Sequence, residues 1–437
     1  MEAKIIDNLV ADVVVGGDLK KKESAINEIW QTAHKEGIYP ASIHDLYRAR
    51  GENKFGDMTV PAMNLRVLTY DLARAIFRSA LSINAGAFIF EIARSEMGYT
   101  DQKPLEYTTV ILAAALREGY KGPVFIQGDH FQVNAKNYKQ DPKAEVDGLK
   151  KLIKESIDAG FYNIDIDSST VVDHTRPDLL EQQKENGALC AELTAYIREL
   201  EPSGITISVG GEIGEVGTQN STPEDLRAFM KVYSEKLPKG VEGISKISVQ
   251  TGTSHGGTVN ADGTIAKVNL DFNVLKSISG VCKKEFKMAG SVQHGASTLP
   301  EDEFHKFPSC DTAEVHLATQ FQNMVFDSKY FPADLKKKIY DWLKVEAQNE
   351  FKPGMTDEQF FYKSRKKALG PFKKDIMALR DREKIALEIQ GKFSFLFDQL
   401  KIKDSANLIK KYIKEQKNEK KFDLTYHKKA ESFEGDD

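Results

Sequence analysis

Short apolar runs alternate with longer amphipathic segments along the middle of the chain. The short runs have the length and residue types of buried strands, whereas the longer segments repeat apolar residues at intervals of three and four, as helices do. In the segment 144–160, for example, Val146, Leu149, Ile153 and Ile157 fall on one face of a helix. This alternation predicts βα units and a parallel sheet, and therefore an α/β protein.

The number of apolar runs decides between two α/β folds. The predicted strands are 59–64, 87–93, 123–128, 162–167, 206–213, 245–252, 287–295 and 313–319. Eight consecutive parallel βα units predict a closed (β/α)8 barrel, the TIM barrel. The alternative is an open doubly wound sheet, but the GxGxxG turn typical of that fold does not follow the first predicted strand.

The two ends of the chain lack the βα rhythm. Residues 1–55 are predicted to form an N-terminal helical segment that covers the barrel, and residues 56–329 to form the catalytic barrel itself. Residues 330–437 show helical patterns only, and their last stretch is strongly charged. This predicts a C-terminal helical extension with a frayed tail, which could be a subunit contact or a lid.

Composition and charge exclude several classes of protein. A net charge of -4 over 437 residues gives no electrostatic support for a nucleic-acid partner. The chain has no run of about 18 apolar residues, and its N-terminus is acidic where a signal peptide needs positive charge. The three cysteines lack zinc-knot spacing, which fits a reducing compartment. We therefore expect a soluble cytoplasmic protein with no membrane contact.

Titratable and hydroxyl side chains collect near the carboxyl ends of the predicted strands. Barrels of this type carry their active sites at that end. In chain order, these residues are Asp129, His130, Asp167, Glu212, His255, His294, His316 and Thr319.

Three of the histidines and one of the carboxylates belong to the residue types that bind zinc. His130, His255, His294 and Glu212 leave four different strands at the same end of the barrel. A single histidine at a strand end is more often a hydrogen-bonded packing residue, but three beside glycine or aspartate favour a metal site. Four candidates exceed the three ligands usual in catalytic zinc sites, so Glu212 could instead support a ligand.

Asp129 needs a role of its own, because it precedes a proposed ligand and should point the other way along the strand. A carboxylate near a metal and a sugar hydroxyl suits proton transfer. The alternatives are a helix N-cap or a residue that orients a ligand.

Small and hydroxyl residues after the sixth to eighth strands predict an anion site. Gly256 and Gly295 allow close approach of the backbone, and Ser297 and Thr319 add hydroxyl groups. Free N–H groups there would form a nest for phosphate, which barrels often bind at this place. Alternatively, the glycines serve only to form tight turns.

Taken together, these motifs resemble the class II, zinc-dependent fructose-bisphosphate aldolases and their tagatose-bisphosphate relatives. The resemblance covers roughly residues 55–325. Its motifs are GDH at 128–130, IDSS at 166–169, GGEIG at 210–214, GTSHG at 252–256 and QHGAST at 293–298.

The resemblance implies both a reaction and a set of roles. The reaction is aldol cleavage and condensation of a phosphorylated ketose, most simply fructose 1,6-bisphosphate to glycerone phosphate and glyceraldehyde 3-phosphate, in a homo-oligomer. Zinc is the implied metal, although iron, cobalt or manganese accept similar ligands. The implied ligands are His130, Glu212, His255 and His294, with Asp129 as the catalytic acid–base group and Asp167 in support. The implied substrate contacts are Asn64, Gly256, Gly295, Ser297 and Thr319, together with His316 in place of a family asparagine.

The sequence departs from the family pattern in three places. Gly210 replaces the first glutamate of the family's Glu-x-Glu motif, and His316 stands where an asparagine contacts the ketose phosphate. The loop after Glu212, which carries the proton donor in the family, is shortened, and Glu215 could substitute. The short loop and His316 leave open a metal-dependent epimerase or isomerase of sugars or sugar acids. A non-catalytic companion subunit of a tagatose-bisphosphate aldolase is a third possibility.

Overall fold

The computed structural model describes residues 1–214, 219–252, 260, 270–296, 299–416 and 419–424. Within these ranges, nine strands form one sheet in which all pairs are parallel. The strands are β1 (Ile38–Ala41), β2 (Val60–Asn64), β3 (Ile89–Ala93), β4 (Gly122–Gln132), β5 (Asn163–Asp167), β6 (Ser208–Glu212), β7 (Lys246–Val249), β8 (Ser291–Gln293) and β9 (Glu314–Leu317).

Strands β2 to β9 close into a barrel. Each pairs with the next in the chain, and β2 pairs with β9 to complete the ring. These eight strands correspond to the eight apolar runs, so the predicted (β/α)8 barrel is confirmed. Strand β1 lies outside the ring against the start of β4, with Ile38 opposite Gly122. It falls in the segment 1–55, for which we predicted helices, because four residues that include Pro40 give little strand signal.

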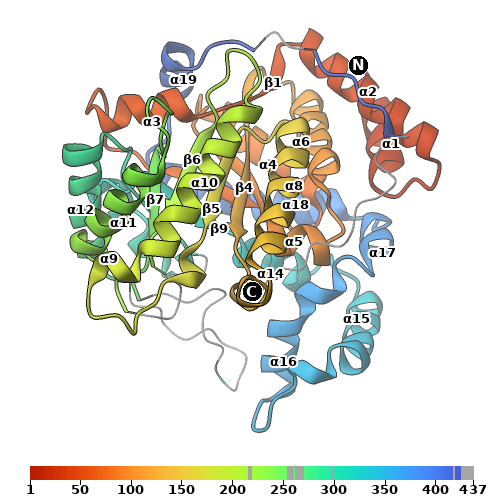
Figure 1. Cartoon of the computed structure of the whole chain (residues 1–437). Coiled ribbons are helices and arrows are strands. Elements are labelled where there is room, and N and C mark those ends of the chain that lie inside the picture. The colour runs from red at the N-terminus through yellow and green to blue at the C-terminus, as the bar shows by residue number, and fades with distance from the viewer. Residues whose placement is uncertain (215–218, 253–259, 261–269, 297–298, 417–418, 425–437) are drawn as a thin grey trace.

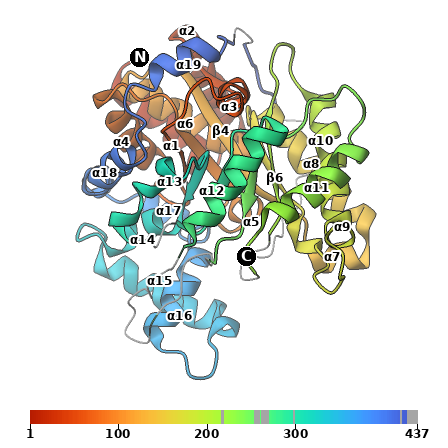
Figure 2. The same cartoon turned by 90° about the vertical axis from the view of Figure 1, so that its left-hand side faces the viewer.

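The helices surround the barrel (Figures 1 and 2). Before and between the strands lie α1 (Ala3–Val14), α2 (Leu19–Lys35), α3 (His44–Gly51), α4 (Thr69–Ser82), α5 (Arg94–Tyr99), α6 (Pro104–Glu118), α7 (Ala135–Gln140), α8 (Pro142–Asp158), α9 (Leu179–Gln182), α10 (Lys184–Leu200), α11 (Pro223–Lys236), α12 (Phe272–Val281) and α13 (Lys306–Ser309), and α14 (Thr319–Asp327) follows the last strand. In the parts of the chain that the structure describes, no helix is long and apolar enough to cross a membrane.

The residues after 330 form further helices. They are α15 (Ala333–Glu346), α16 (Asp357–Ser364), α17 (Lys373–Met377), α18 (Arg382–Gln399) and α19 (Ala406–Tyr412). Helix α18 packs against α4, and its Phe397 also contacts Phe88, the residue before β3, with ring centroids 5.7 Å apart. Helices α15 and α16 lie at the lower edge of the molecule, away from the strands (Figures 1 and 2). Residues 419–424 return to the N-terminal helices, and Phe422 packs against Trp30.

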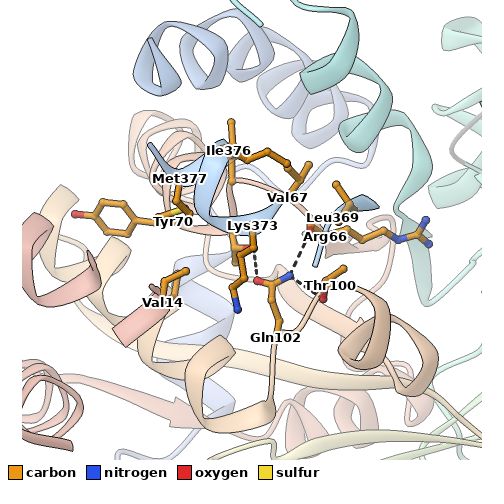
Figure 3. A pocket seen from close by; sticks show the side chains of 13 residues that line it. Val14, Arg66, Val67, Tyr70, Thr100, Gln102, Leu369, Lys373, Ile376 and Met377 are labelled. Atoms are coloured by element: carbon orange, nitrogen blue, oxygen red, sulfur yellow. Dashed lines mark hydrogen bonds between the residues drawn. The ribbon is translucent and has the colours of Figure 1, made fainter. Parts of the chain in front are cut away.

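A small pocket lies where α17 meets the barrel (Figure 3). Its polar side chains bind one another: Thr69 Oγ1 donates to Gln102 Oε1 at 2.6 Å, and Gln102 Nε2 donates to the carbonyl oxygens of Leu65 and Arg66 at 3.3 Å. Lys373 Nζ donates to Glu106 at 2.6 Å. The bond of Lys373 ties the C-terminal extension to α6, the helix that precedes β4.

The interior of the barrel is unusually polar. Barrels of this type are commonly filled by branched apolar side chains. Here Gln127, Asp165, Lys246 and Glu314 are all buried inside the ring and bonded to one another. Tyr47, from α3, closes the base of the barrel with a hydrogen bond to Glu314.

Candidate active site and metal centre

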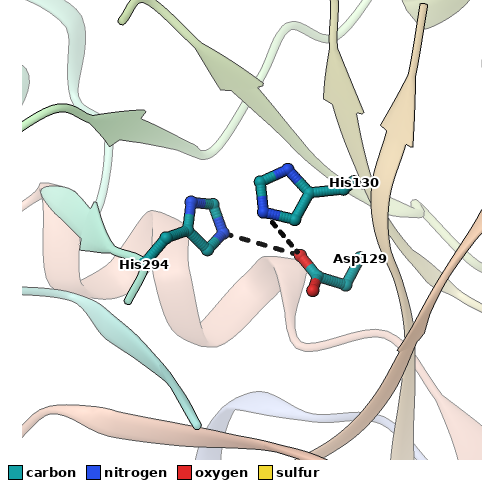
Figure 4. Close-up of side chains that lie close together, drawn as sticks. All are labelled: Asp129, His130 and His294. Atoms are coloured by element: carbon teal, nitrogen blue, oxygen red, sulfur yellow. Dashed lines mark ion pairs between the residues drawn. The ribbon is translucent and has the colours of Figure 1, made fainter. Parts of the chain in front are cut away.

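A β-bulge at the end of β4 places two adjacent side chains on the same side. The pairing of β4 with β5 shifts register between Gly128 and Phe131, and His130 has a left-handed backbone with φ 40°. The alternation of a regular strand would point Asp129 away from His130, but the bulge turns both towards His294 (Figure 4). Non-glycine residues rarely take this conformation, and such strain clusters at functional sites.

Two imidazoles and a carboxylate converge from three strands in the geometry of metal ligands. The rings of His130 and His294 lie 4.1 Å apart between centroids. Their Nδ1 atoms face Glu212, at 3.5 Å from Oε2 and 3.9 Å from Oε1, respectively. Ligand atoms about 2.0–2.2 Å from a tetrahedral metal lie roughly 3.4 Å from one another. Among the described residues, donor atoms close enough to share one divalent cation form two groups around these rings, His130 with Asp167 and Glu212, and Asp129 with His130 and His294. Nδ1 of both rings faces the Glu212 carboxylate.

The ionisation states of these groups differ. Burial opposes the charge of His130, but the charge of Asp129 and the hydrogen bond of Asp167 prevail and raise the pKa of His130 well above its usual range, so a metal at this ring must displace its proton. Burial and the charge of Asp167 raise the pKa of Glu212 well above its usual range. Burial and the neighbouring charge of His130 lower the pKa of His294 well below its usual range, so its ring is neutral, as a ligand must be. A divalent cation between these groups would offset the cost of an ionised Glu212.

Asp167 supports His130 from the end of β5. Its Oδ2 lies 3.1 Å from His130 Nδ1 and accepts a hydrogen bond of 2.7 Å from Gln132. Burial opposes ionisation, but the bonds with His130 and Ser169 prevail and lower the pKa of Asp167 to about 2. Because His130 Nδ1 cannot donate to Asp167 and ligate a metal at once, a cation held at this nitrogen would take Asp167 as a further ligand, in the group His130, Asp167 and Glu212.

Asp129 lies on the opposite side of the imidazole pair from Glu212. Its Oδ1 is 3.5 Å from His294 Nε2, 3.8 Å from His130 Nε2 and 3.1 Å from His316 Nδ1. Burial opposes its ionisation, but the charges of His130 and His316 prevail, so the pKa of Asp129 is well below its usual range. An ionised carboxylate in this position can accept a proton.

The residues expected to contact substrate are only partly described. Asn64 ends β2, where its Nδ2 donates to Glu96 at 2.5 Å; its buried Oδ1 has no hydrogen-bond partner among the described residues. Gly295 follows β8 with φ 71°, and Thr319 begins α14. His255, Gly256, Ser297 and Glu215 lie outside the described residues.

His316 lies deeper than a substrate-contacting residue would. It is buried below Asp129 and His294, and its Nδ1 is 3.0 Å from His294 Nε2. Its Nε2 is 2.6 Å from Glu314 Oε1. Both ring nitrogens therefore already contact protein groups.

The polar layer beneath His316 was not predicted from the sequence. Lys246 and Glu314 begin their strands and Asp165 lies in the middle of β5, so none stands at the carboxyl end where we expected site residues. The available signal was the two-residue spacing of a strand: Asp165 precedes Asp167 by two residues, and Glu314 precedes His316 by two. Residues spaced in this way line the same face, here the interior.

Comparison with known proteins places this chain in one family. The family model for class II fructose-bisphosphate aldolase matches residues 46–379, and the chain belongs to that family. A comparison with curated protein sequences gives no match.

Solved structures share the fold at low sequence identity. A probable tagatose 6 phosphate kinase from Sinorhizobium meliloti is 16% identical, with a TM-score of 0.54 and coverage of 82% of this chain and 95% of its own. A fructuronate-tagaturonate epimerase from Cohnella laeviribosi is 13% identical, with a TM-score of 0.52, and the match covers 90% of this chain and 86% of the epimerase chain. A fructose-bisphosphate aldolase from Campylobacter jejuni is 17% identical, with a TM-score of 0.45, and the match covers 83% of this chain and 94% of the aldolase chain.

Proposed function

We propose that the protein catalyses metal-dependent aldol cleavage and condensation of a phosphorylated ketose. The most direct substrate is fructose 1,6-bisphosphate, which would give glycerone phosphate and glyceraldehyde 3-phosphate. The observation that carries this proposal is the convergence of His130, His294 and Glu212 with Asp129 beside them, in a chain of the class II aldolase family.

The proposed metal ligands are His130, Glu212 and His294, with His255 as the further ligand expected from the sequence. Zinc is the proposed metal, since imidazole nitrogens dominate the set. When bound, the metal would supply Lewis-acid polarisation of the ketose carbonyl and hydroxyl oxygens.

The chain's own groups would carry the proton and hold the substrate. Asp129 would accept the proton of the hydroxyl next to the carbon–carbon bond that breaks, because its ionised carboxylate lies beside the imidazole ligands. Asn64 Oδ1 would accept a hydrogen bond from a substrate hydroxyl. Gly295, Thr319, Gly256 and Ser297 would bind a phosphate group, and this contact would fix the distance of the reacting bond from Asp129. Glu215 is the proposed donor of the returning proton.

Metal removal and replacement tests the proposal. The purified protein is dialysed against chelator, reloaded with Zn²⁺, and assayed for triose phosphates released from fructose 1,6-bisphosphate. We expect activity to disappear and return, and His130→Ala to be inactive in both states. His305→Ala, at an exposed position outside the site, is the matched control and should behave as wild type. Full activity in chelator, with less than about a tenth of an equivalent of metal, would contradict the proposal.

A second candidate function is epimerisation of a keto sugar or keto sugar acid. The observation that favours it is the 3.1 Å contact of the His316 ring with Asp129, at a position where the family pattern expects asparagine. Two groups that can exchange protons then stand side by side. The name of the Cohnella laeviribosi structure suggests fructuronate as the test substrate. Exchange of substrate hydrogen with deuterated solvent, without release of three-carbon products, would favour this function over cleavage.

A further inference from the structure

A buried lysine lies beneath the candidate metal centre. Lys246 leaves β7 into the barrel interior, where it has no exposed surface. Its Nζ donates to Gln127 Oε1 and Asp165 Oδ2, each at 2.8 Å, and to Glu314 Oε1 at 2.5 Å. Burial opposes the charge, but the two carboxylates prevail and raise the pKa of Lys246. All three hydrogens of the ammonium group are therefore committed to side chains of β4, β5 and β9, which do not pair with β7 but face it across the barrel interior.

The missing glutamate of the Glu-x-Glu motif makes room for this lysine. A Cβ at Gly210 would lie 2.3 Å from Asp165 Oδ1 and 3.0 Å from Lys246 Cε. A glutamate at position 210 is thus incompatible with Asp165 and Lys246 in their present positions. The departure at Gly210 and the polar layer are parts of one arrangement, in which Asp165 on β5 supplies a carboxylate.

The same network of contacts reaches His316, the second position at which the sequence departs from the family pattern. Glu314 Oε1, which accepts from Lys246, also lies 2.6 Å from His316 Nε2 and so accepts its hydrogen. His316 Nδ1 lies 3.0 Å from His294 Nε2. The same Nδ1 lies 3.1 Å from Asp129 Oδ1 and 3.1 Å from Glu91 Oε2, so the His316 ring is held from both of its nitrogens. Its contact with His294 Nε2 leaves Nδ1 of His294 turned towards Glu212. Partners of this kind fix the tautomer and the ring orientation of a ligating histidine.

We propose that Lys246 is a positioning residue for the metal ligand His294 and acts through Glu314 and His316. The lysine holds the Glu314 carboxylate, the carboxylate holds the His316 ring, and that ring holds His294 with Nδ1 towards Glu212. The inference rests on the metal centre of the proposed function, but not on the identity of the substrate.

The test is metal affinity in the absence of substrate. Lys246→Met removes the ammonium group and keeps the length of the side chain. Its Zn²⁺ affinity, measured by competition with a chelator, should fall about 10–100-fold, the usual effect of losing such a partner. The absorption spectrum of the Co²⁺-loaded variant should also change, because the ligand geometry changes.

Lys392→Met is the matched control. Lys392 is a buried lysine of α18, bonded to Glu301 at 2.8 Å and packed on Phe304 and Phe395, outside the barrel interior. Its loss should reduce stability but leave Zn²⁺ affinity within about twofold of wild type, since it shares no partner with the site. Equal affinities of wild type and Lys246→Met would overturn the inference.

A double variant separates positioning from charge balance. Lys246→Met with Asp165→Asn removes one charge of each sign, so it should recover stability relative to Lys246→Met but not Zn²⁺ affinity. Recovery of wild-type affinity would overturn the positioning role. If Lys246→Met does not fold, Glu314→Gln tests the same chain of contacts, and wild-type affinity in that variant would equally overturn it.

The outcomes also separate this inference from the proposed function. Wild-type protein that binds no divalent metal would refute both. Metal binding that depends on Lys246, without aldol cleavage, would refute only the proposed function. Cleavage with a metal affinity independent of Lys246 would refute only the inference.

Discussion

Gly128 controls the bulge that aims Asp129 and His130, and Gly128→Ala should disturb it. A Cβ at this position would lie 2.4 Å from Cζ and 2.5 Å from Cε1 of Phe131, a ring with no exposed surface. Carbon atoms pack best at about 3.5–4.0 Å, so the ring or the strand must move by roughly 1 Å. Overpacking of this kind destabilises a core by about 1–3 kcal/mol. Because Phe131 directly follows His130, we also expect metal affinity to fall about tenfold.

The assay combines urea unfolding, followed by circular dichroism, with chelator competition for Zn²⁺. Gly148→Ala is the matched control: Gly148 lies within α8, and a Cβ there would meet no atom within 4 Å. The same chemical change should stabilise the protein by about 0.5–1 kcal/mol at that position, because alanine is the better helix former. The reasoning is refuted if Gly128→Ala unfolds at the wild-type midpoint and binds Zn²⁺ as tightly as wild type.

Two further predictions test the catalytic pair and the C-terminal segment. Asp129→Ala should keep its metal and slow cleavage about 10²–10⁴-fold, whereas His130→Ala should lose both activity and metal. Metal content and product release per chain are measured for each variant. Loss of metal from Asp129→Ala would contradict the assigned roles. Burial lowers the pKa of Lys420 to about 8, whereas the pKa of a lysine in the unfolded chain is roughly 10.4. The charged form of Lys420 therefore destabilises the folded state at neutral pH. This destabilisation fades as the pH rises through 8 and the folded state releases the proton. The Tm of wild type relative to Lys420→Met should therefore rise from about pH 7 to about pH 9.5, and a constant difference would argue against this origin.

The sequence predicted the barrel because each strand of the ring is an apolar run followed by a helical period. It missed β1, where Pro40 interrupts a short run. It also predicted His130, Glu212 and His294 at one end of the barrel, since parallel strands bring their carboxyl ends together. It did not predict the bulge, which depends on Phe131 packing under Gly128, a contact that follows from the folded register.

Deeper features were harder to predict from the sequence. A charged residue within a strand commonly marks a solvated face, so Lys246 carried no signal until side chains of β4, β5 and β9 were seen to surround it. His316 was assigned to substrate by position alone, whereas its depth in the barrel depends on Glu314 and His294. The fold thus follows from local patterns, and the polar interior follows only from the closure of the ring.

Anomalous diffraction at the zinc edge, on crystals of Zn²⁺-loaded protein, tests the central claim most directly. The account predicts one strong peak bounded by Nδ1 of His130, Nδ1 of His294 and the Glu212 carboxylate, at about 2.0–2.2 Å from each. A peak on the Nε2 side beside Asp129, a peak among Asp165, Glu314 and His316, or no peak near these residues would contradict it.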